Sequence, residues 1–198
     1  QASLVACVGQ DDFGRQALAL LQSEHVNIDG VQALPDAATG VALIMVDDAG
    51  ENTILVMIGA NDRLLAAQVS TGLDALLATP PAVLLINFEI PAEAVRAAVA
   101  WGRGRGVPVV VDAGPIRDYG ADVWGEADVI SPNAAETAHL TGVSAADLPS
   151  ALTAAKRLRA EGPRAVALKL GPLGCLLLDD AGARQWPPFA VVPVDTTG

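Results

Sequence analysis

The sequence predicts an α/β protein with a mostly parallel sheet, helices on both faces and a small β-hairpin lid. Helical and strand patterns alternate along the chain, which is typical of parallel sheets with right-handed crossovers. Apolar runs such as residues 83–86 and 109–111 do not alternate with polar residues, as expected for strands buried on both faces. Two β-type runs joined by an Asp- and Gly-rich loop at residues 47–51 predict the hairpin.

The N-terminal part of the chain begins with a strand and a helix and then departs from this alternation at the hairpin. The predicted elements are a strand at Leu4–Val8, a helix capped by Asp11 or Asp12, hairpin strands at Thr39–Val46 and Asn52–Ile58, and a helix over Asp62–Leu77. We therefore expect an α/β core formed by residues 1–38 and 62–198, with a β lid segment at residues 39–61.

Regular alternation follows from residue 83 onward. Predicted strands are Val83–Phe88, Val107–Val111, Val129–Ser131, Ala165–Leu170, Gly174–Leu178 and Val191–Val194, and predicted helices are Pro91–Trp101, Asn133–Leu140 and Asp147–Ala160. Pro91 suits the first turn of a helix, and Gly142 and Gly162 suit helix ends.

The composition excludes several classes of protein. Apolar residues make up 52% of the 198 residues, which excludes a disordered chain and permits a large core. The formal net charge of −11 repels phosphate backbones and anionic lipids, so we expect no nucleic-acid or membrane partner. Cys7 and Cys175 form neither a disulfide framework nor a zinc motif, and no signal peptide or membrane span is recognisable. A cytoplasmic location is therefore expected.

Polar residues and glycines follow five consecutive predicted strands of the sheet. In order, these are Glu89, Asp112, Asn133 with Glu136, Gly171 with Gly174, and Asp195 with Thr197. Because ligands bind open parallel sheets beyond the carboxyl ends of the strands, the set predicts a single ligand cleft. Asp, Asn and Gly are also ordinary turn residues, so any one of these strand ends has that simpler explanation.

Three of these strand ends support more specific interpretations. Asn133 and Glu136 share a helix face in a capping-box pattern, which leaves the amide able to contact phosphate and the carboxylate able to order magnesium-bound water. Lys169 lies in an apolar strand, so its ammonium must reach a carboxylate, an anionic ligand or solvent. Gly171 and Gly174 fit a turn whose backbone approaches a ligand closely.

Several motifs in the right order resemble the ribokinase family of carbohydrate kinases over essentially the whole chain. They are residues 8–14 (VGQDDFG), 39–42 (TGVA), 50–52 (GEN), 59–61 (GAN), 132–136 (PNAAE), 170–174 (LGPLG) and 195–198 (DTTG). The resemblance implies ATP- and magnesium-dependent phosphorylation of a sugar's primary hydroxyl, most simply ribose to ribose 5-phosphate. It also implies that the lid closes over the sugar and supplies a homodimer contact.

The resemblance assigns roles residue by residue. It implies that Glu89 binds the sugar, that Glu136 acts on magnesium and phosphate, and that a potassium ion binds near Asp195 and Thr197. The positions that match the nucleotide site are Asn133, Lys169, Gly171 and Gly174. It places the catalytic aspartate beyond Gly198 and part of the sugar site before Gln1, so we expect a fragment that holds no catalytic base and does not turn over alone.

Two departures from the family pattern leave other substrates open. Residues 112–115 (DAGP) stand where Asn-Pro-Ala-Pro is usual, and Lys169 stands where a hydroxyl residue is common. A ketose, a 2-keto-3-deoxy sugar acid, and a non-catalytic sugar- or nucleotide-binding member of the fold are therefore alternatives. A dinucleotide-dependent oxidoreductase is not expected, because the G-x-G at residues 102–104 follows a helix and precedes a strand, the reverse of the dinucleotide fingerprint.

Overall fold

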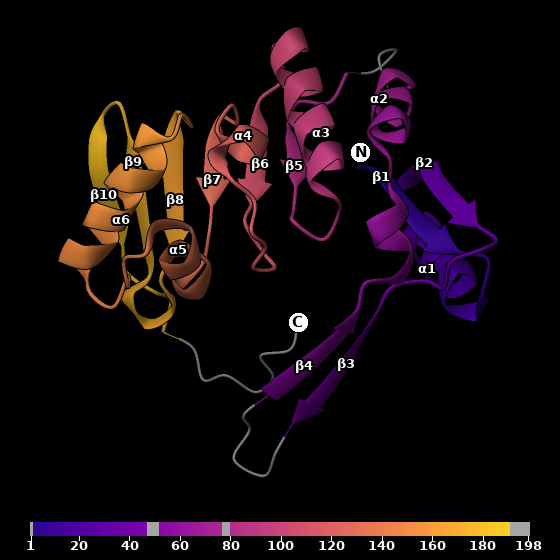
Figure 1. The fold of residues 1–198 in the computed structure, drawn as a ribbon, viewed down its shortest axis with the longest axis horizontal. Helices are drawn as coiled ribbons and strands as arrows, with labels where there is room; N and C mark the ends of the chain where they lie inside the picture. The colour runs from indigo at the N-terminus through magenta and orange to yellow at the C-terminus, as the bar shows by residue number, and fades with distance from the viewer. Residues whose placement is uncertain (1, 47–51, 77–79, 191–198) are drawn as a thin grey trace. The chain divides into compact units, whose positions relative to one another are not determined.

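A computed structural model describes residues 2–46, 52–76 and 80–190 of the chain (Figure 1). The chain divides into two compact units, the first extending to Leu64 and the second formed by Leu65–Phe189. The predicted α/β class is confirmed, because parallel strands joined by helices form the main sheet, and the expected small antiparallel hairpin is present.

The first unit combines a small parallel sheet with the hairpin. Its elements are β1 (Ser3–Gly9), α1 (Asp12–Ser23), β2 (Asn27–Leu34), β3 (Val41–Val46), β4 (Asn52–Met57) and a 3-10 turn, η1 (Gly59–Arg63). Strands β1 and β2 are parallel with α1 between them in the chain, and β3 and β4 form the expected antiparallel pair.

Strand β2 was not expected from the sequence, because Asp29 and Gly30 are typical turn residues. In the structure Gly30 pairs with Val5, and a Cβ atom at residue 30 would lie 2.9 Å from the carbonyl oxygen of Leu4. The glycine therefore permits close approach of the two strands instead of marking a turn.

The second unit is built on a six-stranded sheet. Its elements are α2 (Ala66–Asp74), β5 (Leu84–Ile86), α3 (Ala92–Arg105), β6 (Val109–Asp112), α4 (Ala121–Trp124), β7 (Val129–Ser131), α5 (Ala134–Thr141), α6 (Leu148–Ala160), β8 (Ala165–Lys169), the turn η2 (Gly171–Leu173), β9 (Cys175–Asp179) and β10 (Gly182–Trp186). The strand order is β10-β9-β8-β7-β6-β5, in which β5 to β8 are parallel and β9 and β10 are antiparallel additions.

The interior of this unit lies where the sheet packs against its helices. Val111, Ile130 and Val166 on three adjacent strands have no exposed surface, and small residues of α6 such as Ala151 and Ala155 are equally buried. Burial nevertheless alternates along these strands, since β6 and β8 bury every second residue and Leu85 of β5 is 74% exposed. The carboxyl ends of β5 to β8 all point to one edge of the sheet.

Three local predictions need correction. The helix expected over residues 62–77 is interrupted, because Leu65 is extended and α2 begins only at Ala66. The single-turn helix α4 and the polar, exposed strand β10 were not predicted, since neither carries an apolar periodicity. The predicted strand Val191–Val194 and the candidate site residues Asp195 and Thr197 lie outside the described residues.

Candidate functional site

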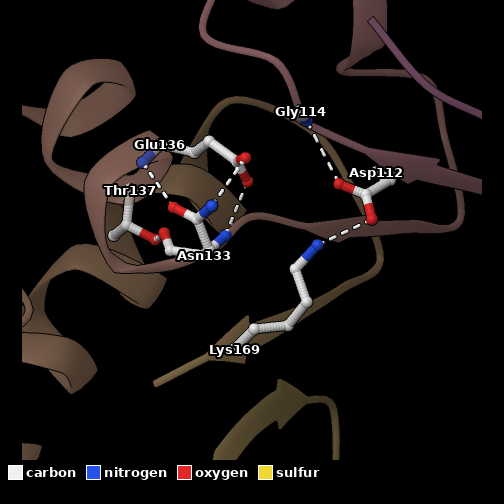
Figure 2. Close-up of polar contacts among 6 residues, drawn as sticks. All are labelled: Asp112, Gly114, Asn133, Glu136, Thr137 and Lys169. Atoms are coloured by element: carbon white, nitrogen blue, oxygen red, sulfur yellow. Dashed lines mark hydrogen bonds and ion pairs between the residues drawn. The ribbon is translucent and has the colours of Figure 1, made fainter. Parts of the chain in front are cut away.

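Three strand ends of the second unit converge on one place. Asp112 ends β6 and pairs with Ser131 of β7, and Asn133 forms a parallel bridge to Lys169 at the end of β8. The amide N–H of Lys169 also donates to the carbonyl oxygen of Pro132 at 2.9 Å. Figure 2 shows the side chains of Asp112, Asn133 and Lys169 on the same edge of the sheet, as the order of the strands predicts.

The N-terminus of α5 is closed by a reciprocal capping box. The Oδ1 atom of Asn133 accepts from the Glu136 amide at 2.9 Å, and both Glu136 carboxylate oxygens accept 2.7 Å bonds, from the Asn133 amide and from its Nδ2 (Figure 2). Glu136 is only 7% exposed. A carboxylate buried to this degree needs such partners, and they fix its position.

Gly114 makes room for this carboxylate. A Cβ atom at residue 114 would lie 2.7 Å from Oε1 of Glu136 and 3.4 Å from Oδ1 of Asp112. The Gly114 amide donates to Asp112 Oδ1 at 3.1 Å, which holds the turn after β6 against the strand end. The absence of a side chain at this residue therefore lets the turn lie beside Glu136.

Lys169 reaches a carboxylate, one of the three outcomes expected for it. Its Nζ lies 2.6 Å from Oδ2 of Asp112, across the end of the intervening strand β7 (Figure 2). The Lys169 side chain is 44% exposed, and ion pairs with that exposure contribute about 0–1 kcal/mol to stability. The pair therefore does more to hold the ammonium at the sheet edge than to stabilise the fold.

The two glycines of the turn after β8 are required for different physical reasons. Gly171 has a φ of +53°, and a Cβ atom there would meet nothing within 4 Å among the described residues, so these residues leave the backbone accessible. Gly174 has a φ of +83°, and a Cβ atom there would overlap the Trp186 carbonyl oxygen. Gly171 thus fits the predicted close approach of a ligand, whereas Gly174 is explained by packing against the end of β10.

Glu89 follows β5, at the edge that also carries Asp112. Its amide N–H donates to Oδ1 of Asn87 at 3.2 Å, and its carboxylate atom Oε2 is buried without a hydrogen-bond partner in the described part of the chain. Sequence reasoning placed Glu89 at this edge but missed Arg117, whose Nη2 atom is buried and unpartnered in the same way. No spacing or motif marks Arg117.

A second polar cluster lies in the first unit, at the cap of α1. Asp11 Oδ1 accepts from the Gly14 amide at 2.8 Å and from Thr39 Oγ1 at 2.6 Å, and Oδ2 accepts from the Thr39 amide at 2.8 Å. These bonds, that from Thr39 Oγ1 first, lower the pKa of Asp11 to about 2. The sequence predicted the cap but not its bond to Thr39, which is 28 residues away.

The described residues contain neither a preformed metal cluster nor a membrane-spanning helix. Within residues 2–46, 52–76 and 80–190, no group of three or more His, Cys, Asp or Glu side chains could hold a metal ion. In the same ranges, no helix is long and apolar enough to cross a bilayer.

A parallel sheet with polar groups and glycines at its carboxyl edge is typical of α/β proteins that bind small ligands. The family model described as pfkB family carbohydrate kinase matches residues 1–198. The chain therefore belongs to the pfkB family of carbohydrate kinases.

Individual relatives are ribokinases from distant organisms. The chain is 29% identical to the Haemophilus influenzae ribokinase over 197 residues and 30% identical to the Mus musculus ribokinase over 201 residues, in both cases along 100% of its own length. It spans 64% and 62% of the lengths of those two proteins. The Schizosaccharomyces pombe ribokinase is 34% identical over 179 residues, which are 88% of this chain and 55% of that protein.

Solved structures resemble the fold closely. The Arabidopsis thaliana ribokinase, complexed with ribose and ATP, is 25% identical with a TM-score of 0.84, and the match covers 99% of this chain and 64% of that one. The Thermotoga maritima ribokinase is 26% identical with a TM-score of 0.82, covering 98% of this chain and 62% of that one.

Proposed function

We propose that the protein is an ATP-dependent sugar kinase that transfers the γ-phosphate to the primary hydroxyl of ribose, giving ribose 5-phosphate and ADP. The observation that carries this proposal is the convergence of Asp112, Asn133, Glu136 and Lys169 at one sheet edge in a chain whose relatives are named ribokinases. One structural relative is described with both ribose and ATP bound.

The nucleotide is proposed to bind at the ends of β7 and β8. The Lys169 ammonium and the free backbone face of Gly171 suit phosphate oxygens, and Asn133 Nδ2 retains one N–H beyond the bond it gives Glu136. Gly174 acts by holding the turn in place. Positioning of this kind supplies most of the catalysis in phosphoryl transfer.

Magnesium fits this edge through water, with Glu136 as the residue that orients it. Both Glu136 oxygens already accept bonds from Asn133, which favours contact with the ion's hydration shell over direct coordination. Bound magnesium would neutralise phosphate charge.

A potassium ion near Asp195 and Thr197 is part of the same proposal, and equal rates in sodium and potassium would contradict it.

The hairpin is proposed to form a homodimer contact. Strands β3 and β4 expose eight large apolar side chains, and such a surface indicates an interaction site. They are Leu43, Ile44, Met45, Val46, Ile54, Leu55, Val56 and Met57. Sedimentation of the full-length protein and of an Ile44→Asp variant tests this contact: the variant should shift toward the monomer.

Kinase activity is tested by incubating the full-length protein with ATP and a panel containing ribose, 2-deoxyribose, a ketose and a 2-keto-3-deoxy sugar acid. Ribose should give the highest kcat/KM. Deoxyribose belongs in the panel because deoxyribokinases of Salmonella are 27% identical to this chain.

We propose that the catalytic base, an aspartate, lies after residue 198. Turnover of ribose by residues 1–198 alone would contradict that placement.

Glu89→Gln tests the sugar site within that assay. Loss of one charge-assisted hydrogen bond should raise the KM for ribose roughly 10- to 100-fold, equivalent to about 1.5–3 kcal/mol, and leave the KM for ATP unchanged. Glu161→Gln, at the exposed end of α6, is the matched control. An unchanged sugar KM in the Glu89 variant would remove this residue from the site.

A further inference from the structure

Among the described residues, two buried polar atoms on oppositely charged side chains have no hydrogen-bond partner at neighbouring strand ends of the second unit. They are Oε2 of Glu89, three residues after β5, and Nη2 of Arg117, five residues after β6. Strands β5 and β6 are adjacent and parallel, so both residues follow the same edge of the sheet. The remaining described residues provide neither atom with a hydrogen-bond partner.

The segments that carry these residues are held side by side. The Phe88 amide donates to the Gly114 carbonyl oxygen at 2.8 Å, and the Tyr119 hydroxyl donates to the Ile90 carbonyl oxygen at 3.0 Å. The rings of Phe88 and Tyr119 meet edge to face at 5.1 Å, and Phe88 has no exposed surface. In sequence, Glu89 lies between Phe88 and Ile90, and Arg117 lies between Gly114 and Tyr119.

The free-energy cost of burying a polar group without a hydrogen-bond partner makes these two atoms notable. A buried group left without a partner costs about 1–3 kcal/mol, and more if it is charged. Neighbouring polar side chains do find partners: Lys169 Nζ lies 2.6 Å from Asp112 Oδ2, and His139 Nε2 lies 3.0 Å from Asp118 Oδ1. A bound ligand would supply the hydrogen-bond partners that Glu89 Oε2 and Arg117 Nη2 lack.

We propose that Arg117 is a second sugar-binding residue beside Glu89, and that the two select a neutral sugar over a sugar acid. Glu89 accepts a hydrogen bond from one hydroxyl, and Arg117 donates to the oxygen of another. Because the two charges cancel, this subsite offers no net attraction to a carboxylate, whereas polyhydroxyl ligands satisfy both a donor and an acceptor. This inference rests on the proposed sugar kinase function and deepens it.

Arg117→Gln in the full-length protein tests the proposal. The KM for ribose should rise roughly 10- to 100-fold, while the KM for ATP stays close to the wild-type value and the melting temperature does not fall, because an unpartnered buried charge is removed. Arg117→Lys keeps the charge but loses the planar pair of donors, so it should give a smaller rise. Arg103→Gln, at the far end of α3 and 3.8 Å from Glu126, is the control. An unchanged sugar KM, or a lower melting temperature without a change in sugar KM, would overturn the proposal.

Substrate analogues make the test specific. With the set of monodeoxy riboses, one analogue should bind the wild type and Arg117→Gln equally, because it lacks the hydroxyl that Arg117 contacts. If the wild type instead prefers the sugar acid and Arg117→Gln loses that preference, Arg117 reads a carboxylate and the proposed selectivity is wrong.

Calorimetric titration of ribose without ATP separates this inference from the function on which it rests. Ribose that binds the wild type but not Arg117→Gln, in a protein without kinase activity, would support the sugar subsite and refute the kinase. Phosphorylation of ribose with equal KM in both proteins would support the kinase and refute the subsite.

Discussion

Two helix N-termini, that of α1 in the first unit and that of α5 in the second, follow parallel strands and start with a short polar cap. At α1, the Asp11 carboxylate caps the helix and binds the amide and hydroxyl of Thr39, just before the hairpin. At α5, Asn133 caps the helix and directs its remaining bonds to Glu136, three residues away.

The difference shows what each cap is built to hold. Asp11 uses its negative charge on a distant segment, so this cap fastens the start of the hairpin to the β1–α1 turn. The α5 cap instead uses a neutral amide and fixes a buried carboxylate beside Gly114 and the Asp112–Lys169 pair. The first arrangement serves structure, and the second keeps a charge available at the candidate site.

Among substitutions at the two caps, Glu136→Gln should impair activity the most. The amide nitrogen of glutamine cannot accept the N–H of Asn133, and the charge next to the proposed magnesium water is lost. We expect kcat, or the apparent affinity for magnesium, to fall by roughly 10- to 100-fold. Steady-state assays at varied magnesium check this, with Glu126→Gln, which is exposed, as the control. Wild-type kinetics in Glu136→Gln would show that this cap too is only structural.

Gly114→Ala should have a smaller effect of the same kind. The added methyl group would lie 2.7 Å from Glu136 Oε1, so the carboxylate or the turn must shift. We expect a loss of kcat of about tenfold or less, since misplacement costs less than removal. The matched control is Gly104→Ala in α3, where a Cβ atom meets nothing within 4 Å. That variant should gain about 0.5–1 kcal/mol in unfolding free energy and keep its activity.

Asp11→Asn should give the smallest effect, visible as a dependence of stability on pH. The folded-state pKa of Asp11 is about 2, below the ordinary value of 3.8, so ionised Asp11 stabilises the fold above pH 4. This contribution disappears as the pH falls from about 4 to about 2. Chemical unfolding should therefore show wild type more stable than the variant at pH 7, with the gap closing toward pH 2. A gap independent of pH would contradict the charged role of Asp11.

Local patterns allowed good prediction of those parts of the fold that local forces decide. Strand β7 has the predicted bounds, and α5 has the predicted cap at Asn133 and the left-handed Gly142 at its end. The prediction missed β2, because close pairing with β1 and not local propensity explains Gly30. The interruption at Leu65 was missed for a similar reason, since the residues around it carry no breaker.

The candidate site was predictable in position but not in its contacts. The order of parallel strands placed Glu89, Asp112, Asn133 and Lys169 at one edge, because strand ends share an edge whatever their side chains do. The Asp112–Lys169 pair joins residues 57 apart, and no local pattern specifies such a partner. Arg117 was missed because its importance lies in burial without a partner, which only coordinates show.

The loop that carries Arg117 contains its own optical reporter. The indole N–H of Trp124 donates to the Tyr119 carbonyl oxygen at 3.1 Å, and Trp124 is 3% exposed. Replacing Trp101 and Trp186 with phenylalanine would leave Trp124 as the single tryptophan among residues 1–198. We expect sugar binding at the proposed subsite to alter this emission through the loop, so occupancy could be followed in real time without nucleotide or label.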